Sequence, residues 1–132
     1  MGNTNILVVE DDSDVRLGYQ VLLMAHQYDT CFAGDSLSAI SEARKQQPDL
    51  ILLDLGLPAG DGFVVIERLL TNLQLAMIPI VVVSARDVRI NRQRALQAGA
   101  KAFVARRWDD HNLLQVIRDV LHGKIPAVTQ VA

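Results

Sequence analysis

The sequence predicts an α/β fold, in which a doubly wound, five-stranded parallel sheet forms the middle layer of a three-layer sandwich. Five short apolar runs recur along the 132 residues, and a longer stretch with a helical spacing of apolar residues follows each run. Several of the runs are apolar at every position, which is typical of strands that are covered on both faces. Strands that alternate with helices form parallel sheets, and we expect right-handed crossovers between them.

Five strands are predicted where the apolar runs occur. They span residues 6–9, 30–33, 50–53, 80–83 and 102–105. The first, third and fourth do not alternate apolar with polar residues, so we expect helices on both of their faces. Cys31, the only cysteine, lies in the second strand. We expect a small buried thiol there, and neither an internal disulfide nor a thiolate metal cluster.

The first two helices are predicted from their capping residues and their apolar spacing. Ser13 is a typical N-cap residue for the first helix, which carries an apolar face. The second helix begins at Asp35 or Ser36 and ends before Pro48. The residues expected to face the core are Val15, Tyr19 and Leu22 in the first helix and Leu37, Ile40 and Ala43 in the second.

Three further helices are predicted after the later strands. The third begins near Asp61, and its apolar residues recur at spacings of three and four, which form one stripe. The fourth spans about residues 87–98 and the fifth about residues 110–122, with Gly99 and Gly123 as the expected C-terminal stops. The stripe of the third helix comprises Phe63, Ile66, Leu69, Leu70 and Leu73, and that of the fifth comprises Leu113, Leu114, Ile117 and Leu121.

Length and composition indicate one domain, for which we expect a cytoplasmic location. Residues 1–123 are expected to form the domain, and residues 124–132 a tail or linker stub. The net charge of −2 predicts neither direct binding of nucleic acid nor binding to a membrane surface. No apolar run approaches the ~20 residues of a membrane-spanning helix, and the first five residues lack the features of a signal peptide.

Polar side chains follow four of the five predicted strands. They are Glu10, Asp11, Asp54, Ser84 and Arg106. Ligands of open parallel sheets bind beyond the carboxyl ends of the strands, so we expect these side chains to converge on one crevice. Clustered carboxylates favour a bound cation, and oxygen ligands without Cys or clustered His indicate Mg²⁺ or a similar ion. Because a carboxylate can be the nucleophile toward a phosphoryl group, the pattern indicates phosphoryl transfer to Asp54.

The acidic residues also have plainer interpretations. Asp12 and Asp14 are expected to stabilise the N-terminus of the first helix through its dipole. Asp54, taken alone, is equally consistent with a turn residue before Gly56, and only the joint strand-end pattern favours the crevice. A hydrolase of the haloacid-dehalogenase type requires a second aspartate two residues after the nucleophile, where this chain has Gly56. We therefore do not expect a hydrolase of this type.

Four stretches of the sequence resemble those of a known family. They read ILVVEDD at residues 6–12, DLILLDLGLPAGDG at 49–62, PIVVVSARD at 79–87 and ALQAGAKAFV at 95–104. In this order and spacing, the chain resembles the receiver domain of bacterial two-component response regulators over about residues 6–121. The resemblance implies a flavodoxin-like sheet with the strand order 2-1-3-4-5.

The resemblance also implies a phosphorelay function and a role for each strand-end residue. The chain would be a signalling domain that catalyses phosphoryl transfer to its own Asp54, and not an enzyme. Asp54 would take a phosphoryl group from a histidine kinase or a phosphotransfer protein. Ser84 would hydrogen-bond that group, and Phe103 would be the switch aromatic that turns inward on activation. The ligands of Mg²⁺ would be Glu10, Asp11, Asp54 and the backbone carbonyl of Gly56. Among them Asp11 is the better candidate for direct contact with the metal.

Two adjacent positions depart from the pattern of the family. The family has Lys-Pro, usually joined by a cis bond, where this chain has Arg106-Arg107. Arg106 keeps the positive charge, but a planar guanidinium is longer than an ammonium and binds differently, so the replacement is not conservative. Without proline we expect a trans bond. The alternative function is therefore a receiver-fold protein-interaction module that no longer switches on phosphorylation.

A basic stretch covers the predicted fourth helix and fifth strand. Seven of the thirteen Lys and Arg residues lie between Arg86 and Arg107, and Asp87 is the only acidic residue there. One interpretation is a solvated helix face. The other is a surface of helix 4, strand 5 and helix 5 that binds an acidic partner or forms a homodimer. No recognition helix or output domain is visible in the sequence, so direct contact with nucleic acid is not expected.

Overall fold

The computed structural model of the chain describes residues 3–55, 61–85, 87–106 and 112–126. Its backbone forms a five-stranded parallel sheet with the order β2-β1-β3-β4-β5, which confirms the predicted fold class and strand order. The strands are β1 (Asn5–Val9), β2 (Asp29–Ala33), β3 (Leu50–Asp54), β4 (Ile80–Ser84) and β5 (Ala102–Ala105).

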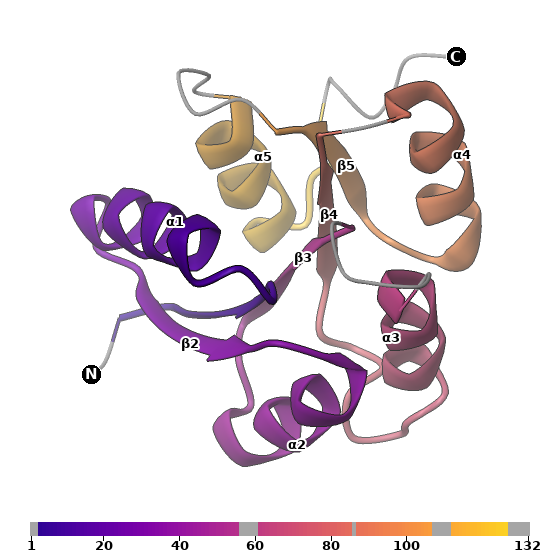
Figure 1. Ribbon diagram of the computed structural model, residues 1–132, viewed down its shortest axis with the longest axis horizontal. Coiled ribbons are helices and arrows are strands. Elements are labelled where there is room, and N and C mark those ends of the chain that lie inside the picture. The colour runs from indigo at the N-terminus through magenta and orange to yellow at the C-terminus, as the bar shows by residue number, and fades with distance from the viewer. Residues whose placement is uncertain (1–2, 56–60, 86, 107–111, 127–132) are drawn as a thin grey trace.

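Helices cover both faces of this sheet (Figure 1). In the part of the chain that the structure describes they are α1 (Ser13–Ala25), α2 (Ser36–Gln46), α3 (Asp61–Leu70), α4 (Val88–Ala98) and α5 (Asn112–Leu121). The helices α1 and α5 pack on one face, whereas α2, α3 and α4 pack on the other. The chain therefore forms the three-layer sandwich, and none of the described helices has the length and hydropathy that a bilayer span requires.

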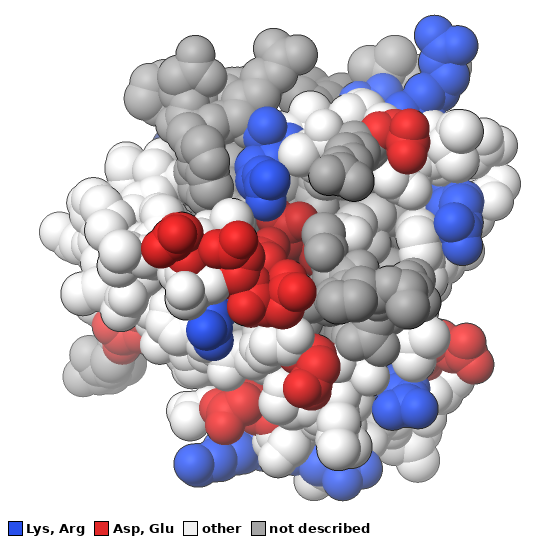
Figure 2. All heavy atoms as spheres, viewed as in Figure 1, with Lys and Arg blue, Asp and Glu red and all other residues white. Residues whose placement is uncertain are grey.

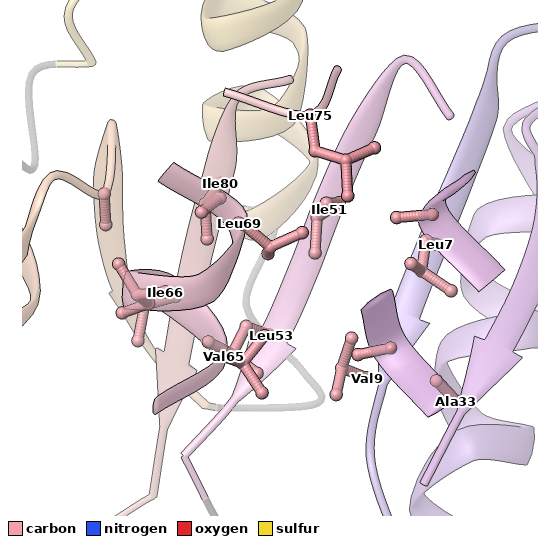
Figure 3. Packing of buried hydrophobic residues seen from close by; sticks show 14 of the residues in the cluster. Leu7, Val9, Ala33, Ile51, Leu53, Val65, Ile66, Leu69, Leu75 and Ile80 are labelled. Carbon is pink, nitrogen blue, oxygen red and sulfur yellow. The ribbon is translucent and has the colours of Figure 1, made fainter. Parts of the chain in front are cut away.

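The apolar core lies in two layers, one on each face of the sheet. Successive strand residues enter opposite layers, so that Ile6 packs with α1 and α5, whereas Leu7 packs with the other three helices. Both side chains are fully buried, which explains why the first predicted strand shows no alternation of apolar and polar residues. Figure 3 shows the layer that contains Leu7, in which Leu69 of α3 points toward Ile51 of β3. Each such buried side chain contributes about 1.5–3 kcal/mol.

Aspartates rather than serines are the N-cap residues of the first two helices. The carboxylate of Asp12 accepts hydrogen bonds from the backbone N–H groups of Asp14 (2.8 Å) and Val15 (3.2 Å). The predicted N-cap, Ser13, is instead the first residue of α1. Asp35 caps α2 and forms a capping box with it. A carboxylate both accepts these hydrogen bonds and interacts favourably with the helix dipole, which explains the preference.

Two residues predicted to face the core are exposed. Leu37 is 75% exposed, because a spacing of three residues falls short of a full helical turn and carries Leu37 off the face that Ala39 occupies. Leu73 is 99% exposed because it lies beyond the end of α3, and Leu75 enters the core in its place. Cys31 is only partly buried, although it packs against the core as predicted.

The C-terminal ends of the later helices agree with the sequence. Gly99 caps α4 with φ of 114°, and Gly123 has φ of 74°, both in the left-handed region that favours glycine. Asp87 is the N-cap residue of α4, which begins one residue later than predicted. Residues 110–111, the predicted start of the fifth helix, lie outside the described residues. The domain boundary at residue 123 stays a prediction, and Pro126 beyond it is buried.

Candidate functional site

The strand ends of β1, β3, β4 and β5 meet at one edge of the sheet and line a pocket. The structure brings together there Glu10, Asp11, Asp54, Ser84 and Arg106. Figure 2 shows acidic side chains gathered near the centre of this face, with basic side chains beside them. The remaining residues that line the pocket are Asp12, Val15, Leu55, Ala85, Asp87 and Asn91. Residues far apart in the sequence thus form one polar site on an apolar sheet.

Asp54 lies at the floor of the pocket and is almost fully buried. It is the last residue of β3, and only 1% of it is exposed. One of its carboxylate oxygens, Oδ2, accepts hydrogen bonds from the hydroxyl of Tyr19 (2.8 Å) and from Nη1 of Arg106 (2.9 Å). Burying a carboxylate without partners costs several kcal/mol, and these two donors offset part of that cost.

Arg106 extends from the end of β5 into the same pocket. Its Nη1 atom lies 2.9 Å from Oδ2 of Asp54 and 3.9 Å from Oε1 of Glu10, so one guanidinium faces two carboxylates. Partial burial alone would lower the pKa of Arg106, but the charge of Asp54 and the hydrogen bond to it outweigh burial and raise that pKa. The arginine therefore stays charged and offsets part of the negative charge of the pocket.

Glu10 is buried with fewer partners than Asp54. Its Oε2 atom accepts a hydrogen bond from the backbone N–H of Asp12 (2.9 Å), whereas Oε1 is buried without a hydrogen-bond partner. Burial is the largest cause that raises the pKa of Glu10 from 4.5 to about 8, and the neighbouring Asp54 adds to it. A buried carboxylate oxygen of this kind is a ready acceptor for a proton or a cation.

The donors in the pocket fit a hard cation such as Mg²⁺. Glu10 offers its unpartnered Oε1 atom, and Asp11 presents an exposed carboxylate at the pocket. In the described ranges no three His, Cys, Asp or Glu side chains are grouped to hold a metal, and Gly56 lies outside those ranges. Mg²⁺ usually keeps several waters and takes one or two carboxylates, so this donor set suits it.

Ser84 and Phe103 lie on the α4 side of the site. Ser84 ends β4 at the pocket, and Nδ2 of Asn91 lies 3.4 Å from its hydroxyl oxygen. Phe103 does not line the pocket; it is fully buried in the core layer of α2, α3 and α4. The guanidinium of Arg92 lies over its ring, 5.9 Å from the centroid. The switch role predicted for Phe103 stays a prediction.

Two contacts in the site were not expected from the sequence. Tyr19 was assigned only to the apolar face of the first helix, and Asn91 was given no role. A tyrosine on a buried helix face does require a partner for its hydroxyl, and that was the available signal for Tyr19. Which group supplies the partner depends on how α1 packs on β3, and the pattern of one helix does not contain that information.

Some of the basic side chains of α4 contact aromatic rings of the same chain. The guanidinium of Arg94 lies 4.0 Å from the centroid of the Phe63 ring, and that of Arg92 covers Phe103. Arg89 is exposed, as the solvated-face interpretation expects. Arg86 and Arg107 lie outside the described residues. The use of this surface by a partner or a second copy therefore stays a prediction.

The chain belongs to the response regulator receiver domain family, whose sequence profile matches residues 6–118. It is 35% identical over 124 residues to the response regulator PleD of Caulobacter vibrioides, covering 93% of this chain and 27% of PleD. It is 31% identical over 125 residues to the phosphate regulon transcriptional regulatory protein PhoB of Escherichia coli, covering 95% of this chain and 55% of PhoB. The chain thus spans about a quarter to a half of these relatives.

Solved structures agree with this assignment. The BeF3-activated N-terminal receiver domain of RstA from Klebsiella pneumoniae superposes with a TM-score of 0.81 at 28% identity, covering 89% of this chain and 98% of that one. The family is part of two-component signal transduction and generally uses Mg²⁺. The flavodoxin-like receiver fold expected from the sequence is confirmed.

Replacing Glu10 with glutamine should stabilise the metal-free protein at high pH. A carboxyl group whose pKa is raised by folding stabilises the fold below its unfolded pKa of 4.5, and this contribution is lost as the pH rises through about 8. Glutamine cannot ionise, so Glu10→Gln should gain roughly 1–3 kcal/mol over wild type at pH 9 and almost nothing at pH 4. Urea unfolding with EDTA at both pH values measures the difference.

The matched control for this variant is Glu67→Gln, which removes an exposed carboxylate from α3, away from the pocket. Its free energy of unfolding should differ little from that of wild type at either pH. A gain for Glu10→Gln that is the same at pH 4 and pH 9, or that Glu67→Gln reproduces, would contradict the account of Glu10.

Proposed function

We propose that this chain is a phosphoacceptor receiver domain that takes a phosphoryl group on Asp54 in the presence of Mg²⁺ and so switches a partner-binding surface. The observation that carries the proposal is the geometry of the pocket. A buried carboxylate at the end of β3 lies beside a charged guanidinium, a hydroxyl and two further carboxylates. Phosphoryl transfer requires mainly positioning and neutralisation of charge, and this set of side chains supplies both.

In the proposed reaction a carboxylate oxygen of Asp54 attacks the phosphorus of the donor. The bond between phosphorus and the leaving group breaks, and its electron pair departs with the leaving group. Arg106 neutralises negative charge beside the acceptor, and we expect the hydroxyl of Ser84, which lines the same pocket, to hydrogen-bond the transferred group. Mg²⁺, when bound, neutralises charge on the carboxylates and on the phosphoryl oxygens. Glu10 and Asp11 are the residues that we expect to hold it, with Asp54 and Gly56 as the remaining predicted ligands.

Membership of the family implies a histidine kinase as partner. We propose that the donor is such a kinase or a phosphotransfer protein, and that α4, β5 and α5 form the surface read by a downstream partner or by a second copy of the chain. The exposed Arg89 and Lys101 support an acidic partner for this surface. A cytoplasmic location is part of the same proposal.

The alternative function, an interaction module that no longer switches, depends on Arg106. The structure favours retention of the chemistry, because Arg106 makes the contact with Asp54 that charge neutralisation requires. Whether modification of Asp54 changes the surface of α4, β5 and α5 is a separate question. Phe103 is already buried in this structure, and residues 107–111 lie outside the described residues. The two functions therefore differ in what happens around Phe103 after Asp54 is modified.

Incubation with acetyl phosphate and Mg²⁺ should add one phosphoryl group to the wild-type protein, detected as intact mass. Asp54→Asn keeps the size of the side chain but lacks a carboxylate nucleophile, so its labelling should be abolished. Asp14→Asn is the matched control, because Asp14 is exposed in the first turn of α1 and does not line the pocket. Absence of labelling in the wild type, or equal labelling of Asp54→Asn, would reject the proposed function.

Beryllofluoride with Mg²⁺, which imitates the phosphoryl group, should shift the NMR signals of both Ser84 and the Phe103 ring. Ser84 lies in the pocket, so its signal reports binding, whereas Phe103 lies in the core and reports propagation of the change. Shifts at both positions are expected of a working switch. A protein that labels on Asp54 but shows an unchanged Phe103 ring would favour the interaction module.

A further inference from the structure

The hydroxyl of Tyr19 contacts Asp54, the proposed acceptor, from inside the protein. Tyr19 is fully buried on α1 and packs in the core layer with residues such as Leu52 of β3. Its hydroxyl lies 2.8 Å from Oδ2 of Asp54, but Tyr19 does not line the pocket. A phosphoryl donor that enters the pocket therefore does not meet the hydroxyl, which contacts Asp54 from within the buried core.

Arg106 engages the same carboxylate oxygen from the side of the pocket. Its Nη1 atom lies 2.9 Å from Oδ2, and a quarter of its side chain is exposed, whereas Tyr19 has no exposed surface. Two donors on different elements, α1 and the end of β5, thus converge on one oxygen of Asp54. A carboxylate held in this way has its orientation determined before any donor arrives.

We propose that Tyr19 is a positioning residue for the phosphoryl acceptor: its hydroxyl holds Oδ2, so that the other oxygen, Oδ1, is the nucleophile, and it restrains the rate at which Asp54 is phosphorylated. This inference rests on the proposed function. Phosphorylation here is the reaction that the hydroxyl regulates, and Tyr19 itself touches neither the donor nor the transferred group.

The restraint follows from the change of charge during the reaction. A lone pair of Oδ1 forms the bond to phosphorus while the bond from phosphorus to the acetate oxygen of acetyl phosphate breaks, and that electron pair leaves with acetate. No proton moves, and Oδ2 changes from a carboxylate oxygen to the carbonyl oxygen of an acyl phosphate. Hydrogen bonds to charged acceptors are about twice as strong as those to neutral ones, so the Tyr19 hydroxyl stabilises the reactant more than the product.

Removing only the hydroxyl isolates this effect. Tyr19→Phe keeps the buried ring and should raise the maximum rate of labelling by acetyl phosphate, at saturating Mg²⁺, by about 5- to 10-fold. The concentration of acetyl phosphate that gives half the maximum rate should not change, because Tyr19 is absent from the pocket lining. Intact mass measured over time at several donor concentrations separates the two quantities.

Infrared spectroscopy gives a readout that a purely structural role would not move. In the phosphorylated wild type the Tyr19 hydroxyl donates to the acyl carbonyl, so the carbonyl band should lie at lower wavenumber than in phosphorylated Tyr19→Phe. Tyr28→Phe is the matched control, because Tyr28 packs against the same core layer and is only partly buried. Its labelling rate and its carbonyl band should equal those of the wild type.

The outcomes separate this inference from the proposed function. A wild type that takes no phosphoryl group overturns both. A wild type that is labelled, with a Tyr19→Phe variant of equal or lower rate and an unshifted carbonyl band, overturns only the role of Tyr19. If Tyr19→Phe does not fold, Tyr28→Phe leaves Tyr19 as the single tyrosine of the two in the chain. Its hydroxyl proton should then give a slowly exchanging, downfield NMR signal that moves upfield on phosphorylation, and a signal that does not move overturns the inference.

Discussion

Asp54 is a carboxylate in the interior of an apolar sheet, and three distant parts of the chain are arranged around it. Tyr19 reaches it from α1 and Arg106 from the end of β5, while β3 itself holds it at the floor of the pocket. An unpaired buried charge would cost several kcal/mol, a large fraction of the 5–15 kcal/mol that stabilises a typical domain. Tyr19 and Arg106 each offset part of this cost, and they link Asp54 to the packing of α1 and to the end of β5.

Glu10 contrasts with Asp54 in the same pocket. Asp54 receives two donors on a single oxygen, whereas Oε1 of Glu10 is buried without a hydrogen bond and Arg106 approaches it only to 3.9 Å. The raised pKa of Glu10 expresses this deficit, since burial favours the neutral form of the group. The two carboxylates thus differ in their partners: Asp54 has two donors on one oxygen, whereas Glu10 has a buried oxygen with capacity for a proton or a cation. This difference is consistent with a site that can take a metal, although no three metal-binding side chains of the described residues are grouped there.

The sequence predicted the sheet, its strand order and the convergence of the strand-end side chains, because these follow from short-range patterns and from the geometry of parallel sheets. It did not predict the contact from Tyr19 to Asp54, which depends on how deeply α1 packs on β3. It also placed Leu37 in the core, but a spacing of three residues falls short of a full helical turn, so Leu37 lies off the face that Ala39 and Ala43 bury. Asp12 rather than Ser13 caps α1, a choice between neighbouring residues that both suit the position. Gly56, which the family resemblance assigns to the metal, lies outside the described residues.

A crystal structure of the protein with beryllofluoride and Mg²⁺ tests the central claim most directly, because it shows which atom of the chain accepts the phosphoryl group. The account predicts beryllium bonded to Oδ1 of Asp54, the Tyr19 hydroxyl still on Oδ2, and the Ser84 hydroxyl hydrogen-bonded to the bound group. Beryllofluoride on Oδ2, on another residue, or absent from a pocket that holds Mg²⁺ would contradict it.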